Sequence, residues 1–229
     1  MKSNRFTWIL IVLSMLSGTA LAQVAPSAQE IAGYKGLFAA AARGDAAEIA
    51  QLAAGGADVN AREAYGRTPL HVATFGRHHE AINALARARA NLDLKESDRY
   101  DAVTVAAVAD DVATLKLLLQ LGASAKQITS RYDGTALIAA AHLGHDEVVR
   151  MLIAAGAPLD HVNNLNWTAL IESIVLGQGG RRHVATLEAL VRAGANVNLA
   201  DRNGQTPLQL ARQRGFRAMV AILEQAGAK

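Results

Sequence analysis

The stretch from Thr135 to Ala157 (TALIAAAHLGHDEVVRMLIAAGA) recurs along most of the chain with small variations, and this recurrence limits the possible folds. Thr135 suits a helix start because its hydroxyl can accept a hydrogen bond from a first-turn amide. Gly144-His145 breaks the first apolar segment, and Gly156 ends the second as a left-handed cap would. The predicted unit is helix, tight turn, helix. It is too small to bury its own apolar face.

A glycine–alanine pair or its substitute ends each unit and gives the period. The alanines stand at positions 57, 90, 123, 157, 195 and 228, so the steps are 33, 33, 34, 38 and 33 residues. Thr68-Pro69-Leu70-His71 precedes Ala90 by 22 residues, and Thr206-Pro207-Leu208-Gln209 precedes Ala228 by the same distance. A 33-residue period with this motif resembles the ankyrin repeat family.

The resemblance covers residues 34–229 and implies an all-α solenoid of about six helix-turn-helix units with projecting β-turn fingers. It also implies a non-enzymatic scaffold that grips proteins with its concave side, made of finger tips and first helices. Leucines and alanines that repeat with the period are predicted to form the core. These are Leu70, Ala73, Leu137, Ala140, Leu170, Leu208 and Ala211 in first helices, and Leu85, Leu118, Leu152, Leu190 and Leu223 in second helices.

Residues 1–22 have the pattern of a secretory signal peptide: Lys2 and Arg5, an apolar run to Leu16, and Ala20-Leu21-Ala22. We expect cleavage after Ala22, a bacterial periplasmic or secreted protein, and no membrane span once the signal is removed; an uncleaved anchor is the competing interpretation. The apolar run is shorter than the roughly 20 residues of a comfortable span. Residues 23–33 are predicted to be a short polar lead-in.

Composition excludes several classes of function. The chain has no cysteine, which rules out disulfides, thiolate metal sites and cysteine nucleophiles. Without Lys2 and Arg5, 21 of the 23 basic residues remain against 20 acidic ones, so the mature chain is almost neutral. Nucleic-acid binding needs clustered positive charge, and we expect none.

The expected contact surface consists of variable positions at the finger tips and late in the first helices. Tyrosine, tryptophan and arginine dominate interface hot spots, so a row of aromatics interleaved with arginine favours a protein partner. The same aromatics could instead brace neighbouring fingers. The candidates are Arg62, Tyr65, Arg67, Phe75, Tyr100, Arg131, Tyr132, His142, Leu143, Leu165, Trp167 and Leu176.

Other polar residues receive structural interpretations. His71 and His145 are expected to hold the repeat turns, and the His78-His79 and His142/His145 pairs lie too far apart for one metal ion. We therefore expect no metal, cofactor or catalytic residue. Asp110-Asp111 is predicted to be a turn and helix start. Glu172 stands at a core position and needs a partner, for which Arg181 or Arg182 is the hypothesis.

The fifth unit carries about five extra residues within 177–183. We interpret them either as a tolerated surface insertion or as a cationic loop that closes on an acidic partner or ligand. The role of the whole chain stays open among a resident periplasmic binder, a toxin-immunity protein, a host-directed effector, and a small-ligand or metal-binding accessory of a periplasmic enzyme. A purely structural role is a further possibility.

Overall fold

The computed structural model describes residues 23–229, and the predicted signal peptide lies outside the described residues. Six helix pairs follow the period read from the sequence. They are α3 (Gly36–Arg43) with α4 (Ala46–Ala54), α5 (Pro69–Phe75) with α6 (His79–Arg87), α7 (Ala102–Val108) with α8 (Val112–Gln120), α9 (Ala136–Leu143) with α10 (Asp146–Ala154), α11 (Ala169–Val175) with α12 (Arg181–Arg192), and α13 (Pro207–Gln213) with α14 (Arg217–Gln225).

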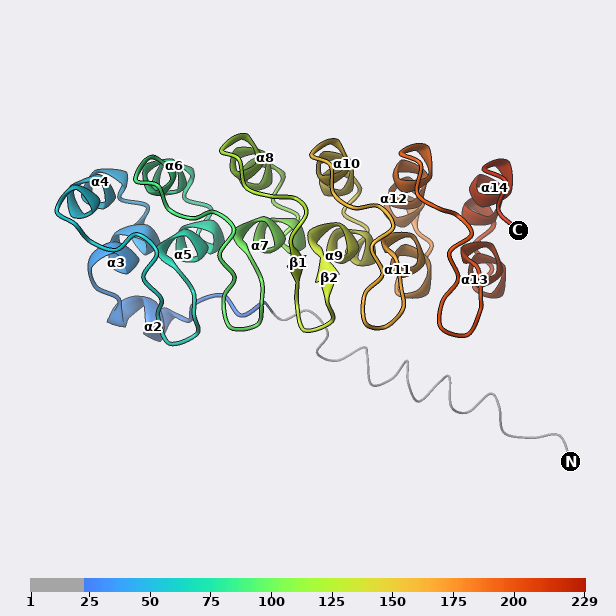
Figure 1. The fold of residues 1–229 in the computed structure, drawn as a ribbon, viewed down its shortest axis with the longest axis horizontal. Helices are drawn as coiled ribbons and strands as arrows, with labels where there is room; N and C mark the ends of the chain where they lie inside the picture. The colour runs from blue at the N-terminus through green and yellow to red at the C-terminus, as the bar shows by residue number, and fades with distance from the viewer. Residues whose placement is uncertain (1–22) are drawn as a thin grey trace, which may run out of the picture.

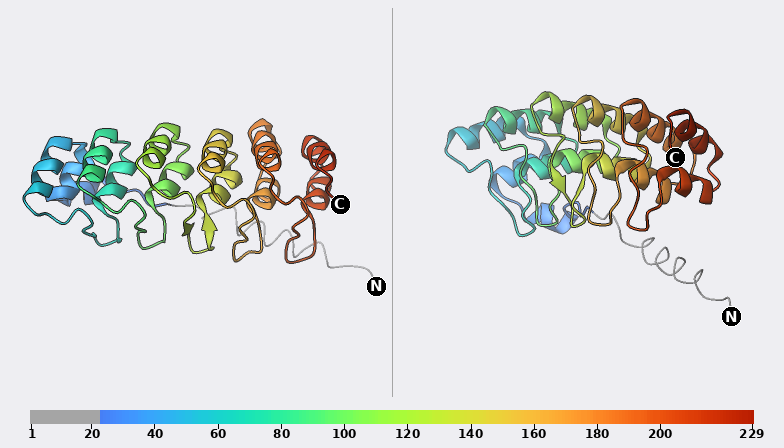
Figure 2. Two further views of the ribbon diagram at one scale, coloured as in Figure 1. Left: turned by 45° about the horizontal axis from the view of Figure 1, so that its top comes forward. Right: turned by 45° about the vertical axis from the view of Figure 1, so that its right-hand side comes forward.

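The pairs stack side by side into an elongated solenoid of two helical layers (Figure 1). Each first helix packs on the first helix of the next unit, and each second helix on the next second helix. The loops between units form a row of fingers below the first helices, which both views of Figure 2 show. The predicted fold of six ankyrin-like units is confirmed.

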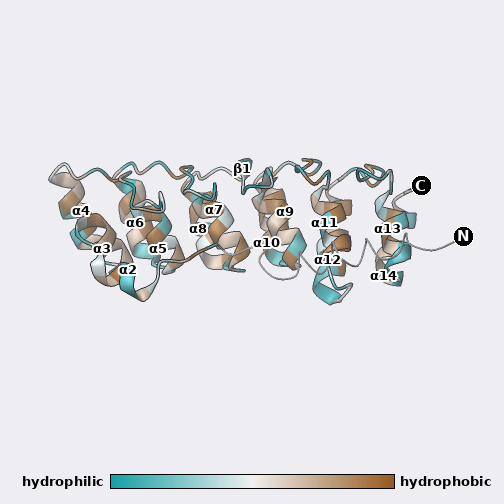
Figure 3. Ribbon diagram, turned by 90° about the horizontal axis from the view of Figure 1, so that it is seen from below, coloured by the Kyte–Doolittle hydropathy of each residue, from teal (hydrophilic) through white to brown (hydrophobic). Residues whose placement is uncertain are grey.

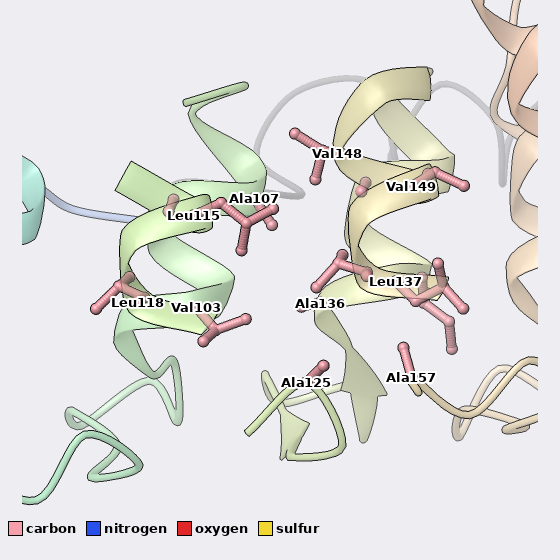
Figure 4. Packing of buried hydrophobic residues seen from close by; sticks show 14 of the residues in the cluster. Val103, Ala107, Leu115, Leu118, Ala125, Ala136, Leu137, Val148, Val149 and Ala157 are labelled. Carbon is pink, nitrogen blue, oxygen red and sulfur yellow. The ribbon is translucent and has the colours of Figure 1, made fainter. Parts of the chain in front are cut away.

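The core runs continuously between the units because no single unit can bury its own apolar stripe. In Figure 4, Leu115 and Leu118 of α8 lie with Val103 of α7 on one side, and Leu137 of α9 and Val148 of α10 on the other. All of the leucines and alanines that we predicted to be core are at most 3% exposed.

Histidines at the turn between paired helices join neighbouring units. His78 Nε2 donates to the carbonyl of Ala42 at 3.0 Å, and His145 Nδ1 donates to that of Ala107 at 2.9 Å. Both carbonyls lie at the end of the preceding first helix, where backbone acceptors lack helical partners. The structural role expected for His145 is confirmed.

His71 joins units in a second way. Its Nε2 donates to the carbonyl of Tyr100 at 3.1 Å, and its Nδ1 accepts from the amide of Thr68 at 3.2 Å. Burial lowers the pKa of His71 to about 4, because the cation would lose its hydration. His71 is therefore neutral at pH 7, which confirms its structural role.

The fingers are tied to one another by backbone hydrogen bonds. The amide of Ser97 donates to the carbonyl of Tyr65 at 2.9 Å, and the amide of Asn164 donates to that of Tyr132 at the same distance. One finger contains the antiparallel ladder of β1 (Ile128–Thr129) and β2 (Gly134–Thr135). The fingers are therefore a connected layer rather than independent loops.

The predicted lead-in, residues 23–33, contains a helix, α2 (Ala28–Gly33), that sequence reasoning missed. Ser27 and Glu30 cap its first turn reciprocally. It lies below α3, at the level of the fingers in Figure 1, and packs against α3. The lead-in is thus part of the packed structure.

The extra residues of the fifth unit lengthen a helix as well as a loop. α12 has 12 residues, whereas α4, α6, α8, α10 and α14 have 9 each, and Arg181 to His183 form its first turn. His183 Nε2 donates to the carbonyl of His142 at 2.9 Å, which repeats the bonds of His78 and His145. The insertion therefore keeps the contact between units.

The pairing proposed for Glu172 with Arg181 or Arg182 is wrong. Arg182 bonds Asp146 and Asp110 instead, at 3.0 and 2.8 Å, because α12 begins with it on the side of the second helices. Asp110 occupies the turn with a φ of 53°, and Asp111 caps α8, as predicted for this pair. Glu172 has other neighbours on the concave face.

Candidate functional site

The twelve predicted contact residues fall into three groups by exposure. Arg62, Tyr65 and Arg131 are exposed, and Arg131 forms an ion pair with Asp98 of the preceding finger at 3.0 Å. Arg67 and Tyr100 are buried. The others are half-buried: Phe75, Tyr132, His142, Leu143, Leu165, Trp167 and Leu176.

Arg67 is only 1% exposed and is not available to a partner in this structure. Its guanidinium bonds Glu63 of its own finger at 3.0 Å, the carbonyl of Val24 at 3.0 Å, and the carboxylate of Glu30 in α2. It also stacks over the ring of Tyr65, with 4.6 Å from Cζ to the ring centroid. Because Val24 and Glu30 belong to the lead-in, Arg67 holds this amino-terminal segment against the second unit.

The aromatic residues do not form one exposed row. Tyr65 is 52% exposed, whereas Tyr100 is 7% exposed and Trp167 packs against the core. Tyr100 therefore fits the bracing interpretation, and Tyr65 remains free for contact. The repeat register separates these cases, because Tyr100 directly precedes its helix cap as the buried Arg67 does, whereas Tyr65 stands two residues earlier in its finger.

A hollow on the concave side brings together five of the predicted residues: Tyr100, Tyr132, His142, Leu165 and Leu176. It is a small hollow of about 50 Å³ that opens to solvent between the third, fourth and fifth units. α7, α9 and α11 form its floor and three consecutive fingers form its wall. Figure 3 looks onto these first helices from below, with the fingers along the upper edge.

Apolar side chains line most of the hollow. Ile138 and Ala139 of α9 line it together with Tyr132 and Leu165, which belong to two neighbouring fingers. We did not predict Ile138, Ala139 or Asn163 as site residues. Asn163 could have been found from the repeat register, because the equivalent position in other fingers also holds a polar residue: Glu63, Glu96, Ser130 and Asp201.

Glu172 is the one acidic side chain among the residues that line the hollow, and it is 4% exposed. Its Oε1 accepts from Asn163 Nδ2 at 2.9 Å, and its Oε2 lies 3.4 Å from His142 Nδ1. Asn163 Oδ1 in turn accepts from the amides of Leu165 and Trp167, both at 3.0 Å. Asn163 thus connects the finger backbone to the buried carboxylate.

The start of α7, which forms part of the floor, is capped by Asp101 in place of the usual threonine. Asp101 Oδ1 accepts from the amide and the hydroxyl of Thr104 at 2.7 and 2.6 Å. Burial raises the pKa of Asp101, and the bonds from Thr104 oppose this rise. The degenerate third unit therefore keeps its helix cap.

The described residues contain neither a metal-binding cluster nor a long apolar helix. Within 23–229, no three histidine, cysteine or acidic side chains gather where they could hold a metal ion. In the same part of the chain, every helix is too short or too polar to cross a membrane.

Comparison with known proteins agrees with the geometry. A family profile described as "Ankyrin repeats (3 copies)" matches residues 16–98, 37–129 and 104–181. The ankyrin repeat protein YahD of Escherichia coli (strain K12) is 31% identical over 190 residues, which cover 82% of this chain and 94% of YahD. Proteins with such repeats are generally scaffolds that bind other proteins.

Two solved structures are also similar. An ankyrin repeat domain from Acinetobacter baumannii AYE has a TM-score of 0.79 and 43% identity, covering 84% of this chain and 98% of that chain. A chain from the complex of the predatory endopeptidase Bd0816 of Bdellovibrio bacteriovorus with immunity protein Bd3460 has a TM-score of 0.64 and 26% identity, with the same coverage. The repeat period, the stacked helix pairs and the matched profile agree, and this chain belongs to the ankyrin repeat family.

Proposed function

We propose that this chain is a non-enzymatic scaffold that acts in the bacterial periplasm or outside the cell and grips one protein partner with its concave face. The observation that carries the proposal is the hollow between the third and fifth units, which joins five of the predicted contact residues. It is apolar, concave and built from rigid helices and tied fingers. Such a surface buries a partner's side chains at little entropic cost.

The exported location is supported by the basic, apolar and small-residue pattern of residues 1–22. The full chain should be expressed in a Gram-negative host and the periplasmic fraction analysed by intact mass. A mature form starting at Gln23 is expected. Full-length protein that stays in the membrane or cytoplasm would contradict the location and leave the binding proposal standing.

Binding is tested by quantitative capture from a periplasmic extract of the source cells. The wild type is compared with a Tyr132→Ala/Leu176→Ala variant, which enlarges the hollow, and with an Arg150→Ala/Arg192→Ala control. The control changes exposed residues of α10 and α12, in the other helical layer. A protein retained by wild type and control but lost by the folded hollow variant supports the proposal. Equal retention by all three would reject the concave site.

An immunity role is the second candidate, favoured by the similarity to a chain of a complex between an endopeptidase and its immunity protein. It predicts that the captured partner is an enzyme. The purified scaffold should then inhibit that enzyme at a one-to-one ratio, and the hollow variant should inhibit it less. An enzyme that keeps full activity when bound would exclude this role.

A further inference from the structure

Glu172 is the polar residue that the solenoid itself explains least. The corresponding positions of the other units hold small or apolar residues, namely Ala39, Val72, Val105, Ala139 and Leu210. A carboxylate at such a position loses hydration, and this loss is unfavourable unless hydrogen bonds replace the water. Packing between the units therefore does not explain why this position holds a glutamate.

One oxygen of Glu172 is satisfied and the other is not. Oε1 accepts from Asn163, whereas Oε2 is buried and has no hydrogen-bond partner among the described residues. His142 Nδ1 approaches Oε2 to 3.4 Å without making a hydrogen bond. The side chain is 95% buried and lines the hollow, so its free oxygen is an acceptor within an apolar recess.

The surroundings limit what this acceptor can bind. Apolar groups of Ile138, Ala139, Leu165 and Leu176 line the same hollow as Glu172, and they suit a methylene stem. A single free oxygen suits the point-like donor of an ammonium group better than the two-pronged guanidinium, since Asn163 already occupies the other oxygen. A charge-assisted bond in this weakly hydrated recess would satisfy the buried carboxylate.

From this geometry we propose that the hollow binds one lysine side chain of the partner protein, with its stem against Ile138 and Leu176 and its ammonium group donating to Glu172 Oε2. Thr129 and Ser130 line the same hollow, and their hydroxyl oxygens already accept from the Thr104 hydroxyl at 3.3 Å and the Tyr132 amide at 3.2 Å. This inference rests on the proposed protein-binding function and names the group that is recognised. Asn163 acts as a positioning residue that holds the carboxylate toward the hollow.

The test uses Nα-acetyl-L-lysine N-methylamide as the probe, titrated into ¹⁵N-labelled mature protein and followed by amide chemical shifts. We expect shifts at residues 129–142 and 163–176. The Nε-acetylated probe, which has the same stem without the charge, should bind at least about tenfold more weakly. Equal binding of the two probes, or no shifts in these segments, would overturn the proposal.

Three variants complete the test. Glu172→Gln keeps the shape and should weaken probe binding about tenfold to a hundredfold, since it removes the charged acceptor. Glu188→Gln, on the exposed side of α12, is the matched control and should bind like wild type. Leu176→Phe narrows the hollow while leaving Glu172 in place, so its loss of binding identifies the recess even if Glu172→Gln unfolds.

The same variants separate this inference from the proposed function. If Glu172→Gln still retains the partner captured by wild type while the Tyr132→Ala/Leu176→Ala variant loses it, the concave scaffold stands and the lysine site is rejected. If the hollow variant also retains the partner, the proposed site itself is rejected. Binding of the free lysine probe without dependence on Glu172 would likewise reject the lysine site.

Discussion

Arg182 Nη1 lies 2.8 Å from Asp110 Oδ2, although the two residues are 72 positions apart and belong to the fifth and third units. Arg182 Nε also donates to Asp146 Oδ1 of the fourth unit at 3.0 Å. One side chain therefore connects three consecutive units. Most other contacts in a solenoid join only nearest neighbours.

We predict that Arg182→Ala lowers the free energy of unfolding by about 0.5–1 kcal/mol, because half-exposed ion pairs are screened by water. Urea unfolding at pH 7 checks this value. Arg150→Ala, which removes a bond to Asp146 from within the same helix, is the control and should cost less. A larger loss for the control would mean that the connection across units adds nothing.

The ion pair between Arg182 and Asp146 should also make the stability of the protein depend on pH in the acidic range. Burial acts to raise the pKa of Asp146, but its bonds from Arg182 and Arg150 outweigh this effect and lower the pKa below the usual 3.8. The stabilisation is present above pH 3.8 and is lost as pH falls through the folded-state value. The stability difference between wild type and Arg182→Ala should therefore shrink as pH falls below 3.8 through the lowered folded-state pKa of Asp146.

His71 should make the protein less stable in mild acid. Its pKa is about 4 in the folded state and 6.5 in the reference state, so the unfolded chain binds a proton between these values and the folded chain does not. The free energy of unfolding should fall by up to about 3 kcal/mol as pH drops from 6.5 to 4. Well above pH 6.5 the imidazole is neutral in both the folded and the unfolded state, so His71 no longer lowers the free energy of unfolding.

A His71→Gln variant isolates that contribution. Gln209 fills the same motif position in the sixth unit and accepts from the amide of Thr206 at 3.0 Å, so glutamine can keep the helix cap. The stability difference between wild type and His71→Gln should shrink from pH 7 to pH 4, as measured by urea unfolding. A difference that stays constant over this range would contradict the prediction.

Arg89 stands where the other units have the glycine of the glycine–alanine pair. Its φ is 64°, a left-handed conformation that costs a residue with a Cβ about 1 kcal/mol. Arg89→Gly should therefore raise the free energy of unfolding by up to about 1 kcal/mol. The reverse change, Gly122→Ala at a φ of 95° with open space around the new Cβ, should lower it by a similar amount.

Arg67 should hold the lead-in, residues 23–33, in its packed position. Arg67→Ala leaves the carboxylates of Glu63 and Glu30 without their cation, so the free energy of unfolding should fall. Hydrogen exchange should accelerate in α2, at Ile31 and Tyr34, before it does in α9. Arg43→Ala removes an exposed ion pair with Glu48 and serves as the control. Unchanged exchange in α2 would show that Arg67 does not hold it.

Periodicity predicted the fold well, because it reports burial directly. Leu152 and its equivalents recur every 33–38 residues, and a residue that recurs in this way must face the common core. The helix caps at Thr135 and Asp111 were likewise predictable from residue type. The polar sequence of residues 23–33 gave no period, so α2 and its bond to Arg67 were not foreseen.

The site was predicted only in part, because exposure at the finger tips depends on the neighbouring unit. Tyr65 lies three residues before its helix cap Thr68 and is 52% exposed, whereas Tyr100 lies directly before its cap Asp101 and is 7% exposed. The partner of Glu172 was misjudged for a related reason. Its true neighbours, Asn163 and His142, come from a finger and from another unit, and no single-helix spacing relates them to Glu172.

Asn163 gives this molecule an engineering constraint. Its side chain orders the finger through the amides of Leu165 and Trp167 and also holds the carboxylate beneath the hollow. A substitution of Asn163 that changes ligand preference would therefore also remove the hydrogen bonds that order the finger, and less of the protein would fold correctly. A library designed to change specificity should therefore keep Asn163 and diversify Leu165, Leu176 and Tyr132, whose half-buried side chains face the incoming group.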